Sequence, residues 1–183
     1  AQVRLLHGPL QLESGLLEGL NSEGFGTAAE LEQLLERHQA SAAAVVMAAA
    51  VADQRLQQPL SGKLSKQELQ EVLHSPASWE MVPDLLHQMV QRRSADQVLM
   101  GFAAHSGDVL TQAEAKFQRK GCDLLFANPI DQPGVGFAAS ANQGWLLSRG
   151  ASPEAMGPCS KLALAHGLLD RLRLRLPQAA RAD

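Results

Sequence analysis

The chain has 183 residues, of which 45% are hydrophobic, and carries a formal net charge of −3 with a pI near 6.1. This composition allows one domain with its own core, and it argues against a nucleic-acid-binding surface, which concentrates Lys and Arg on one face. No apolar run reaches the roughly 18 residues of a membrane span, and no signal peptide opens the sequence. We therefore expect no membrane partner and a cytoplasmic location.

The first third of the chain predicts two strands and a helix. Residues 2–6 read as a strand, whereas the glycine-rich segment 15–26 has no periodicity that assigns it. Thr27 precedes Glu30 by three residues, which is the spacing of a capping box and predicts a helix start. Residues 42–50, AAAVVMAAA, suit a helix or a central strand, and the strand-helix rhythm of the chain favours the strand.

Residues 51–82 are the least regular part of the sequence. Residues 51–55 leave the end of the expected strand, where open α/β sheets place their ligand sites. A loop is expected over 57–62, and helical periodicity is present over 65–73. Pro83 then leads into a helix with an apolar side, because proline is tolerated in the first turn.

The segment that follows predicts one βαβ unit. The unbroken apolar run 98–104 is typical of a strand covered on both faces of a parallel sheet. A helix comes next, with Asp108 or Thr111 as its cap, and Gly121 ends it. Residues 122–127 form the second strand, and the crossover should be right-handed.

The remainder predicts a long loop, a strand and a closing helix. The loop, 129–137, is dense in Pro and Gly, and loops of that kind are usually functional or disordered. A strand over 143–148 and a helix over 160–174 complete the chain. We expect an α/β fold with three layers, a Rossmann-like, mostly parallel sheet with helices on both faces, forming a single domain over residues 1–183.

Two smaller groups of residues have ordinary interpretations. Cys122 in a strand and Cys159 in a turn lack metal-ligand spacing, so reduced thiols are expected, although the two could pair if folding brought them close. A cationic run near the end is expected to be the polar side of a final helix or strand: Arg171, Arg173, Arg175 and Arg181.

Lys116 and Lys120 lie four apart on the predicted helix and therefore side by side. Like charges at this spacing destabilise a helix by a few tenths of a kcal/mol. If both ammonium groups contacted an oligophosphate, each contact would contribute up to about 4 kcal/mol before desolvation, at a dielectric near 20 and about 4 Å. The pair is either a phosphate-binding site or a solvated basic face.

Several segments occur in an order that points to one family. They are Ala49–Asp53, Gly62–Lys66, Pro83–Leu86, Gly101–Ala104, Lys116 with Lys120, Asp123–Asn128 and Gln132–Phe137. Their order and spacing resemble the bacterial phosphopantothenoylcysteine synthetase domain of coenzyme A biosynthesis, which is often fused to a flavin-dependent decarboxylase. The similarity extends from about Gln2 to Asp170.

The resemblance implies a CTP-dependent ligase. In that family the carboxylate of 4'-phosphopantothenate attacks the α-phosphorus of CTP, pyrophosphate leaves, and the amine of cysteine displaces CMP to form an amide. CTP is then a substrate, Mg²⁺ is an expected cofactor with no ligand assigned, and the expected assembly is a homodimer with a fused or separate decarboxylase. The alternative is a non-catalytic nucleotide-binding or assembly module derived from the ligase.

The resemblance also implies site residues. Lys116 and Lys120 match triphosphate-binding lysines, and Lys63 matches a catalytic, nucleotide-contacting lysine on a mobile flap. Asp53 matches a position near the base and ribose of the nucleotide, away from the phosphates. Phe102 matches a nucleotide-contacting position, where its ring would form an aromatic wall. The other matching positions are Met47, Ala48, Ala49, Pro83, Asp84, Leu85 and Leu86, the last four at a helix terminus. Considered one at a time, these residues also have ordinary structural interpretations. Phe102 is then a core residue, Asp53 caps a helix or turn, and Lys63 is a solvated lysine in a loop.

The three lysines are expected to converge on one cleft at the carboxyl edge of the sheet. Three departures from the family pattern accompany this expectation. The family's initial glycine-rich turn and asparagine-bearing segment do not precede Ala1, so an N-terminally incomplete domain is expected. His105 and Pro129 stand where relatives commonly carry acids. A dinucleotide-dependent oxidoreductase is disfavoured because no Gly-x-Gly-x-x-Gly joins a strand to a helix.

Overall fold

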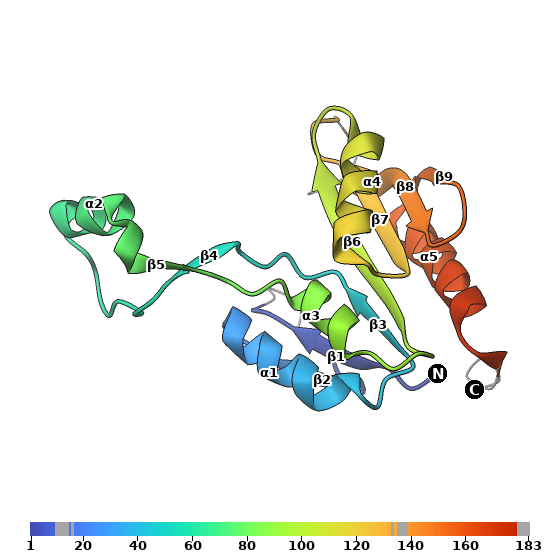
Figure 1. Cartoon of the computed structure of the whole chain (residues 1–183), viewed down its shortest axis with the longest axis horizontal. Coiled ribbons are helices and arrows are strands. Elements are labelled where there is room, and N and C mark those ends of the chain that lie inside the picture. Colours follow the sequence, from blue (N-terminus) through green and yellow to red (C-terminus); the bar gives the residue numbers. More distant parts are fainter. Residues whose placement is uncertain (10–14, 16, 133, 135–138, 179–183) are drawn as a thin grey trace.

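The computed structural model describes residues 1–9, 15, 17–132, 134 and 139–178. Strands and helices alternate along most of this part of the chain (Figure 1). The strands are β1 (Arg4–His7), β2 (Asn21–Gly24), β3 (Ala44–Met47), β4 (Gln54–Leu56), β5 (Trp79–Met81), β6 (Val98–His105), β7 (Leu124–Pro129), β8 (Ala141–Ser148) and β9 (Glu154–Ser160). The helices are α1 (Ala28–Gln39), α2 (Lys66–His74), α3 (Leu85–Arg92), α4 (Val109–Lys120) and α5 (Lys161–Arg175).

The main sheet has five strands in the order β3-β6-β7-β8-β9. β3, β6 and β7 run parallel, and β8 and β9 continue the sheet in antiparallel pairing. The expected βαβ unit is β6-α4-β7, in which Phe102 pairs with Phe126 across the two strands. β1 and β2 form a separate parallel pair. The expected α/β, Rossmann-like class is confirmed.

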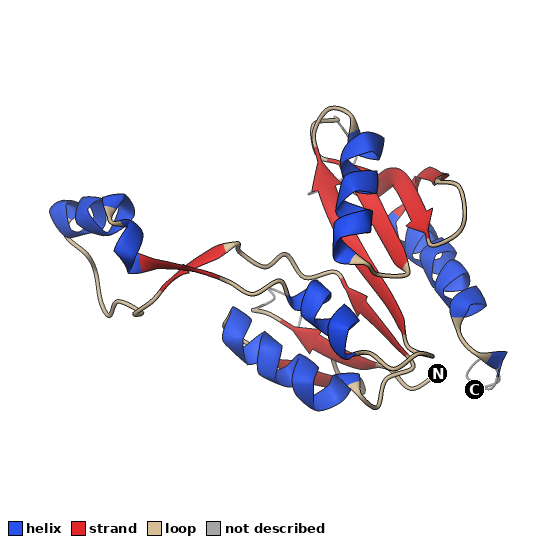
Figure 2. Ribbon diagram, viewed as in Figure 1, coloured by secondary structure: helices blue, strands red, loops and turns tan. Residues whose placement is uncertain are grey.

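Helices cover both faces of the main sheet (Figure 2). On one face α1, α3 and α4 pack through residues such as Leu31, Leu86 and Ala113 against Leu99 and Leu125. On the other face α5 packs against alternate residues of the same strands, through Leu164, Leu168 and Leu172. Each fully buried leucine contributes about 1.5 to 3 kcal/mol. The expected three-layer arrangement is therefore present, with two cores separated by the sheet.

Local signals place the helix ends where the sequence predicts them. Thr27 Oγ1 accepts from the Glu30 N–H at 3.2 Å, and the Glu30 carboxylate accepts from the Thr27 N–H, which completes the capping box of α1. Of the two caps considered for α4, Asp108 is the one used, because its carboxylate accepts from the Thr111 N–H at 3.2 Å. Gly121 ends α4 in the left-handed conformation, with φ of 69°.

Several strands differ from the sequence expectation. The strand expected over 42–50 is confined to β3, and the alanines after Met47 form a loop. β2 lies within the glycine-rich segment that had no assignment. β4, β5 and β9 were not expected, and Cys159 lies in β9 rather than in a turn. These strands are short or contain Gly and Pro, so they lack the alternation that identifies a strand.

Residues 54–81 form a long projection, which we call the arm; the rest of the described chain is the body. β4 and β5 pair antiparallel, and α2 lies at the far end, away from the main sheet (Figures 1 and 2). Ser65 caps α2 with a full capping box, which confirms the helix expected over 65–73. No residue of α2 is buried.

Cys122 is buried, Cys159 is half-buried, and both are free thiols. Within the described residues, none of the helices combines the length and apolar character needed to cross a bilayer. The cationic run lies on α5, where Arg171 pairs with Glu154 at 2.5 Å, while Arg181 lies outside the described residues. Pro133 and residues 135–137 of the predicted long loop lie outside them too.

Candidate functional site

Lys120 and Asp84 form an ion pair between α4 and α3. Asp84 is the N-cap of α3 and accepts from the His87 N–H at 3.1 Å. Burial alone would raise the pKa of Asp84, but Lys120 and the His87 N–H together hold it below its usual value. The Lys120 side chain is 18% exposed, so this cation is turned toward the body rather than into solvent.

Lys116 lies one turn earlier on the same side of α4. Burial, and then Lys120 and Arg119, lower the pKa of Lys116, whereas Asp84 and Asp53 act to raise it. Lys116 is half-buried and has no ion pair among the described residues. We call Lys116, Lys120, Asp53 and Asp84 the lysine cluster. A half-buried cation without a paired anion favours binding of an external anion.

His105 lies at the end of β6, near the lysine cluster. Burial, and then the charges of Lys116 and Arg119, lower its pKa. Its Nε2 atom is buried and has no hydrogen-bond partner among the described residues. The imidazole is therefore neutral at pH 7, and it places no negative charge beside Lys116.

The lysine cluster lies on the face of the sheet covered by α3 and α4. Lys120 is in the last turn of α4, four residues before β7 begins, and it meets Asp84 at the start of α3. Asp53, expected at the far end of the ligand, is near enough to Lys116 to act on its pKa.

Lys63 is not brought to the lysine cluster of its own chain. It lies in the exposed loop between β4 and α2, in the part of the arm that projects away from α4 (Figure 1). The expectation that Lys63 converges with Lys116 and Lys120 is therefore not met within one chain. Lys63 has no ion pair or hydrogen bond with any part of the chain that the structure describes.

Phe102 is also separate from the lysine cluster. Its ring packs edge to face on Phe126, with ring centroids 5.9 Å apart, in the core beneath α5. Because side chains alternate along β6, Phe102 points to the face opposite α3 and α4. The ordinary core interpretation describes its position in the structure.

The remaining predicted positions lie near the cluster in two groups. Leu85 and Leu86 are buried in the core, so only their backbone N–H groups at the start of α3 are available to an anion. Pro83 precedes the cap and has no N–H. Met47 ends β3 and packs against the same core, and Ala48 and Ala49 follow it in an exposed loop.

A pocket of about 750 Å³ adjoins the cluster through the loop after β3. The loop contributes Ala49 to Ala52, the residues just before Asp53, and the start of α1 contributes Thr27 and its neighbours. Gly8, Phe25 and Arg55 also line it. The sequence placed a ligand site where residues 51–55 leave the strand, and Val51, Ala52 and Arg55 line this pocket. The contributions of Gly8, Phe25 and the start of α1 were not expected.

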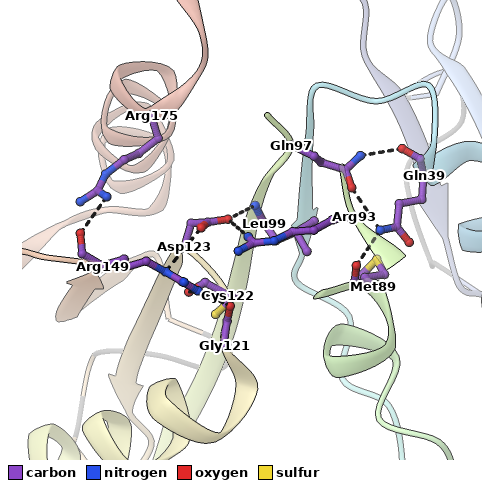
Figure 3. Close-up of polar contacts among 10 residues, drawn as sticks. All are labelled: Gln39, Met89, Arg93, Gln97, Leu99, Gly121, Cys122, Asp123, Arg149 and Arg175. Atoms are coloured by element: carbon purple, nitrogen blue, oxygen red, sulfur yellow. Dashed lines mark hydrogen bonds and ion pairs between the residues drawn. The ribbon is translucent and has the colours of Figure 1, made fainter. Parts of the chain in front are cut away.

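Sequence analysis also missed a polar clamp at the C-terminal end of α4. Figure 3 shows Asp123 between Arg93 and Arg149, and its carboxylate also accepts from the Leu99 N–H at 2.9 Å. Arg149 donates to the Gly121 carbonyl at 2.5 Å, directly after the turn that carries Lys120. The clamp therefore fixes the end of α4 and with it the backbone of Lys120.

Comparison with known proteins places this fold and site in context. The family model of the DNA/pantothenate metabolism flavoprotein C-terminal domain matches residues 1–175. The coenzyme A biosynthesis bifunctional protein CoaBC of Mycobacterium bovis is 33% identical over 172 residues, which cover 87% of this chain and 40% of that protein. The chain thus spans about two fifths of the length of the curated relatives it matches.

Solved structures show the same fold. The C-terminal domain of a CoaBC protein aligns with a TM-score of 0.72 at 21% identity, covering 94% of this chain and 75% of that one. A variant of Cab2 in complex with phosphopantothenate-cysteine aligns with a TM-score of 0.61 at 14% identity, covering 86% and 54%. With the match of the family model, the resemblance to the synthetase half of CoaBC is confirmed: the chain belongs to the DNA/pantothenate metabolism flavoprotein C-terminal domain family.

Proposed function

We propose that the chain is a CTP-dependent ligase domain of coenzyme A biosynthesis, which joins 4'-phosphopantothenate to L-cysteine through an acyl cytidylate. The observation that carries this proposal is the half-buried Lys116, which has no ion pair among the described residues and lies beside Lys120. Two like charges held together away from solvent cost folding energy. A bound triphosphate would offset that cost.

The proposed chemistry needs positive charge at the leaving group. When the carboxylate of 4'-phosphopantothenate attacks the α-phosphorus of CTP, the departing pyrophosphate gains negative charge. Lys116 and Lys120 would bind the β- and γ-phosphates and stabilise that charge in a partly dry site. Lys120 would exchange its ion pair with Asp84 for contacts to phosphate, and the N–H groups at the start of α3 would add donors.

The neighbouring pocket has room for the acid substrate. Its volume of about 750 Å³ is within the usual range for small-ligand sites. Ala49 to Ala52 line the pocket, and the next residue, Asp53, belongs to the lysine cluster. The pocket and the cluster are therefore joined by one short loop. An acid in the pocket could thus present its carboxylate to a nucleotide in the cluster. The Cab2 variant, which has the same fold, was solved in complex with phosphopantothenate-cysteine, and this supports a substrate of that chemical class.

Mg²⁺ is the metal that we propose to accompany CTP. It prefers oxygen ligands and is usually held by one or two carboxylates together with substrate phosphates. Asp53 and Asp84 are the two carboxylates of the cluster and fit that donor set. Within the described residues, the cluster included, no three metal-ligating side chains gather at one place, so the substrate phosphates would supply further ligands. When bound, Mg²⁺ would neutralise part of the triphosphate charge.

A second function, a nucleotide-binding or assembly module without catalysis, has one observation in its favour. Lys63, the lysine expected to act on the intermediate, is away from the lysine cluster of its own chain. Incubation of the chain with CTP and 4'-phosphopantothenate distinguishes the two functions. Release of pyrophosphate that depends on the acid supports the ligase, whereas CTP binding without pyrophosphate release supports the module.

Calorimetric titration with CTP tests the nucleotide site itself. Lys116→Ala should weaken CTP binding about 10- to 100-fold, since a hydrogen bond to a charged group contributes about 1.5 to 3 kcal/mol. Lys161→Ala, which removes an exposed lysine from α5 on the opposite face of the sheet, serves as the matched control and should bind CTP normally. Equal affinity in both variants would argue against the lysine cluster as the triphosphate site.

A further inference from the structure

His105 is the last residue of β6 and lies on the side of the main sheet that carries the lysine cluster. The pairing of β6 with β7 is continuous from Met100 to His105, so side chains alternate between the two faces along this stretch. Ala103 points into the core beneath α3 and α4. His105 follows it by two residues and therefore points to the same face.

Hydrogen bonds hold the backbone around His105 against α4. Gln112, one turn before Lys116, donates to the Ser106 carbonyl at 2.6 Å. On the other side, the Ile130 N–H donates to the His105 carbonyl at 3.0 Å. The imidazole is therefore held close to the turn of α4 that carries Lys116.

The Nε2 atom of His105 is buried and has no hydrogen-bond partner among the described residues. Buried polar atoms in proteins almost always have a partner, and an exception points to strain, a functional role or a partner from outside the protein. A histidine ring turns over a broad range of angles about its Cβ–Cγ bond. Because Nε2 makes no hydrogen bond, the ring can turn toward a ligand at Lys116 without losing one.

The charges that act on His105 are of one sign. Burial, and then Lys116 and Arg119 of α4, lower its pKa. Its register partner on β7, Pro129, carries no charge, and Asp131 in the loop after β7 accepts from a backbone N–H of the turn after β6 at 2.8 Å. In the free protein, a proton on His105 would add a cation to a place that already holds cations.

A bound anion reverses this balance. Negative charge within about 4 to 6 Å of a histidine favours the charged imidazole. The two acids of the lysine cluster, Asp53 and Asp84, act on Lys116. A triphosphate at Lys116 and Lys120 would bring several negative charges to the face on which His105 lies.

We propose that His105 is a third phosphate-binding residue of the site, and that it takes up a proton as the triphosphate of the nucleotide binds. The proposal rests on the nucleotide site of the proposed ligase. The proton comes from the buffer and bonds to the ring nitrogen that is unprotonated in the free protein. The charged ring then donates from Nε2 to a phosphate oxygen. The free protein thus avoids a third clustered cation, and the bound protein gains one.

The proposal fixes the sign of the pH dependence. Below the pKa of the free imidazole both states are protonated, and above the pKa of the bound imidazole neither is. Between the two, binding takes up one proton, so CTP affinity falls by up to about tenfold per pH unit as pH rises. Burial and Lys116 place the lower limit of this window below 6.5, and the anion raises the upper limit.

Calorimetric titration with CTP between pH 6 and 8 measures this dependence in wild type and in His105→Gln. Glutamine keeps a neutral hydrogen-bonding side chain but takes up no proton, and ionisation of the nucleotide itself cancels in the ratio of the two affinities. Wild type should bind CTP about tenfold more tightly than His105→Gln at pH 6, and about equally at pH 8. A ratio that is the same at every pH overturns the proposal.

His166→Gln is the matched control for His105→Gln. It removes an exposed histidine from α5, on the opposite face of the main sheet, and should bind CTP with the wild-type pH dependence. Loss of the dependence in this variant as well would mean that no specific histidine carries it, which overturns the proposal.

His87 is the other histidine whose charge reaches the lysine cluster, because it acts on Asp84. Histidine ring signals in the NMR spectrum of the labelled protein separate the two, since each signal is assigned by its loss in His105→Gln or His87→Gln. On addition of CTP at pH 7, the His105 signal should move from the neutral to the protonated position. A His105 signal that stays neutral overturns the proposal, and protonation of His87 instead assigns the proton to that residue.

The results also separate this proposal from the ligase function. If wild type releases pyrophosphate but His105→Gln keeps the wild-type pH dependence of CTP binding, the ligase stands and the role of His105 is wrong. If the His105 signal becomes protonated with CTP but the chain releases no pyrophosphate, the binding role is right and the ligase function is wrong. Absence of CTP binding by wild type overturns both.

Discussion

α1 in the body and α2 in the arm begin with the same local signal but differ in what they pack against. Thr27 and Ser65 each form a full capping box, with Glu three residues later. α1 buries Leu31, Leu34 and Leu35, whereas α2 buries no residue. A cap contributes about 1 kcal/mol and fixes where a helix starts. Burial decides how stable the helix is, so the arm is the less stable region and the body the more stable one.

The same contrast applies to the lysines of the proposed site. α4 is held by one core, a cap and the Asp123 clamp, so Lys116 and Lys120 have fixed backbones. Lys63 lies in an exposed loop of the arm. A rigid pair suits binding of the triphosphate, which is present throughout the reaction. A lysine in an exposed loop of the less stable region suits a contact that forms and breaks during the reaction.

The largest expected effect on stability is at Gly144, in the middle of β8. A Cβ atom at this position would lie 2.1 Å from the Ala127 carbonyl oxygen and 2.9 Å from the Phe126 ring. Backbone of the neighbouring strand cannot move aside, so Gly144→Ala should lower the free energy of unfolding by about 3 kcal/mol or more. Urea unfolding followed by circular dichroism measures this.

Gly24→Ala, in β2, is the matched control for Gly144→Ala. A Cβ atom there would lie 3.4 Å from the ring of His7, which is a side chain that can shift. This variant should change the free energy of unfolding by less than about 1 kcal/mol. Similar losses in both glycine variants would mean that the main sheet is no more tightly packed than the β1–β2 pair.

Removal of the Asp123 carboxylate should have the next largest effect. Asp123→Ala leaves the Arg93 guanidinium and the Leu99 N–H without their partner in a part-buried site. Breaking a fully buried ion pair lowers the free energy of unfolding by about 3 to 5 kcal/mol. Because this site is partly exposed, we expect a loss of about 2 to 3 kcal/mol for Asp123→Ala. Asp96→Ala, at an exposed acid with no partner in the described chain, should stay within about 0.5 kcal/mol of wild type. If the Asp123 variant unfolded at the wild-type urea concentration, the clamp would contribute nothing to the stability of the body.

Cys122 gives the body a dependence of stability on alkaline pH. Burial raises the pKa of its thiol from 9.0 to about 11. An unfolded chain would ionise this thiol from about pH 9, whereas the folded chain keeps it neutral, so rising pH stabilises the unfolded state. The free energy of unfolding should fall by roughly 2 kcal/mol between pH 9 and 11, at about 1.4 kcal/mol per pKa unit.

Cys122→Ala should lack this part of the pH dependence, and Cys159→Ala should keep it. The two variants differ from wild type by one thiol each, so the difference between their stability curves isolates the buried thiol. Parallel curves for both variants from pH 9 to 11 would contradict the assignment.

Much of the body could be predicted from the sequence because its signals are local. The run 98–104, the caps at Thr27 and Asp108, and Gly121 each act within a few residues. The Lys116 and Lys120 pair is equally local, since four residues on a helix fix their proximity. β4 and β5 were missed because three-residue strands show no alternation, and they form a ladder only through pairing across α2.

The parts of the site that the sequence did not locate depend on tertiary placement. β6 is apolar on both faces, so its sequence does not show which face carries α4, and Phe102, expected as an aromatic wall of the nucleotide site, lies beneath α5. The position of Lys63 depends on the direction of the arm, which no residue near Lys63 encodes. Asp84 was expected near the nucleotide, but its ion pair with Lys120 joins two helices and has no sequence signal.

The smallest expected effect concerns the arm, and the two tryptophans of the chain report on the two regions separately. Trp79 lies in β5, where its indole N–H donates to the Val72 carbonyl at 3.0 Å, and Trp145 lies in β8. In Trp145→Phe, which retains only the arm tryptophan, fluorescence should change at lower urea concentration than in Trp79→Phe, since regions with little burial open first. If a second copy covers the arm, the Trp79 transition should also move to higher urea as protein concentration rises, because each tenfold rise stabilises the covered arm by about 1.4 kcal/mol. Coincident transitions at every concentration would show that arm and body unfold as one unit. The arm would then draw its stability from its own chain.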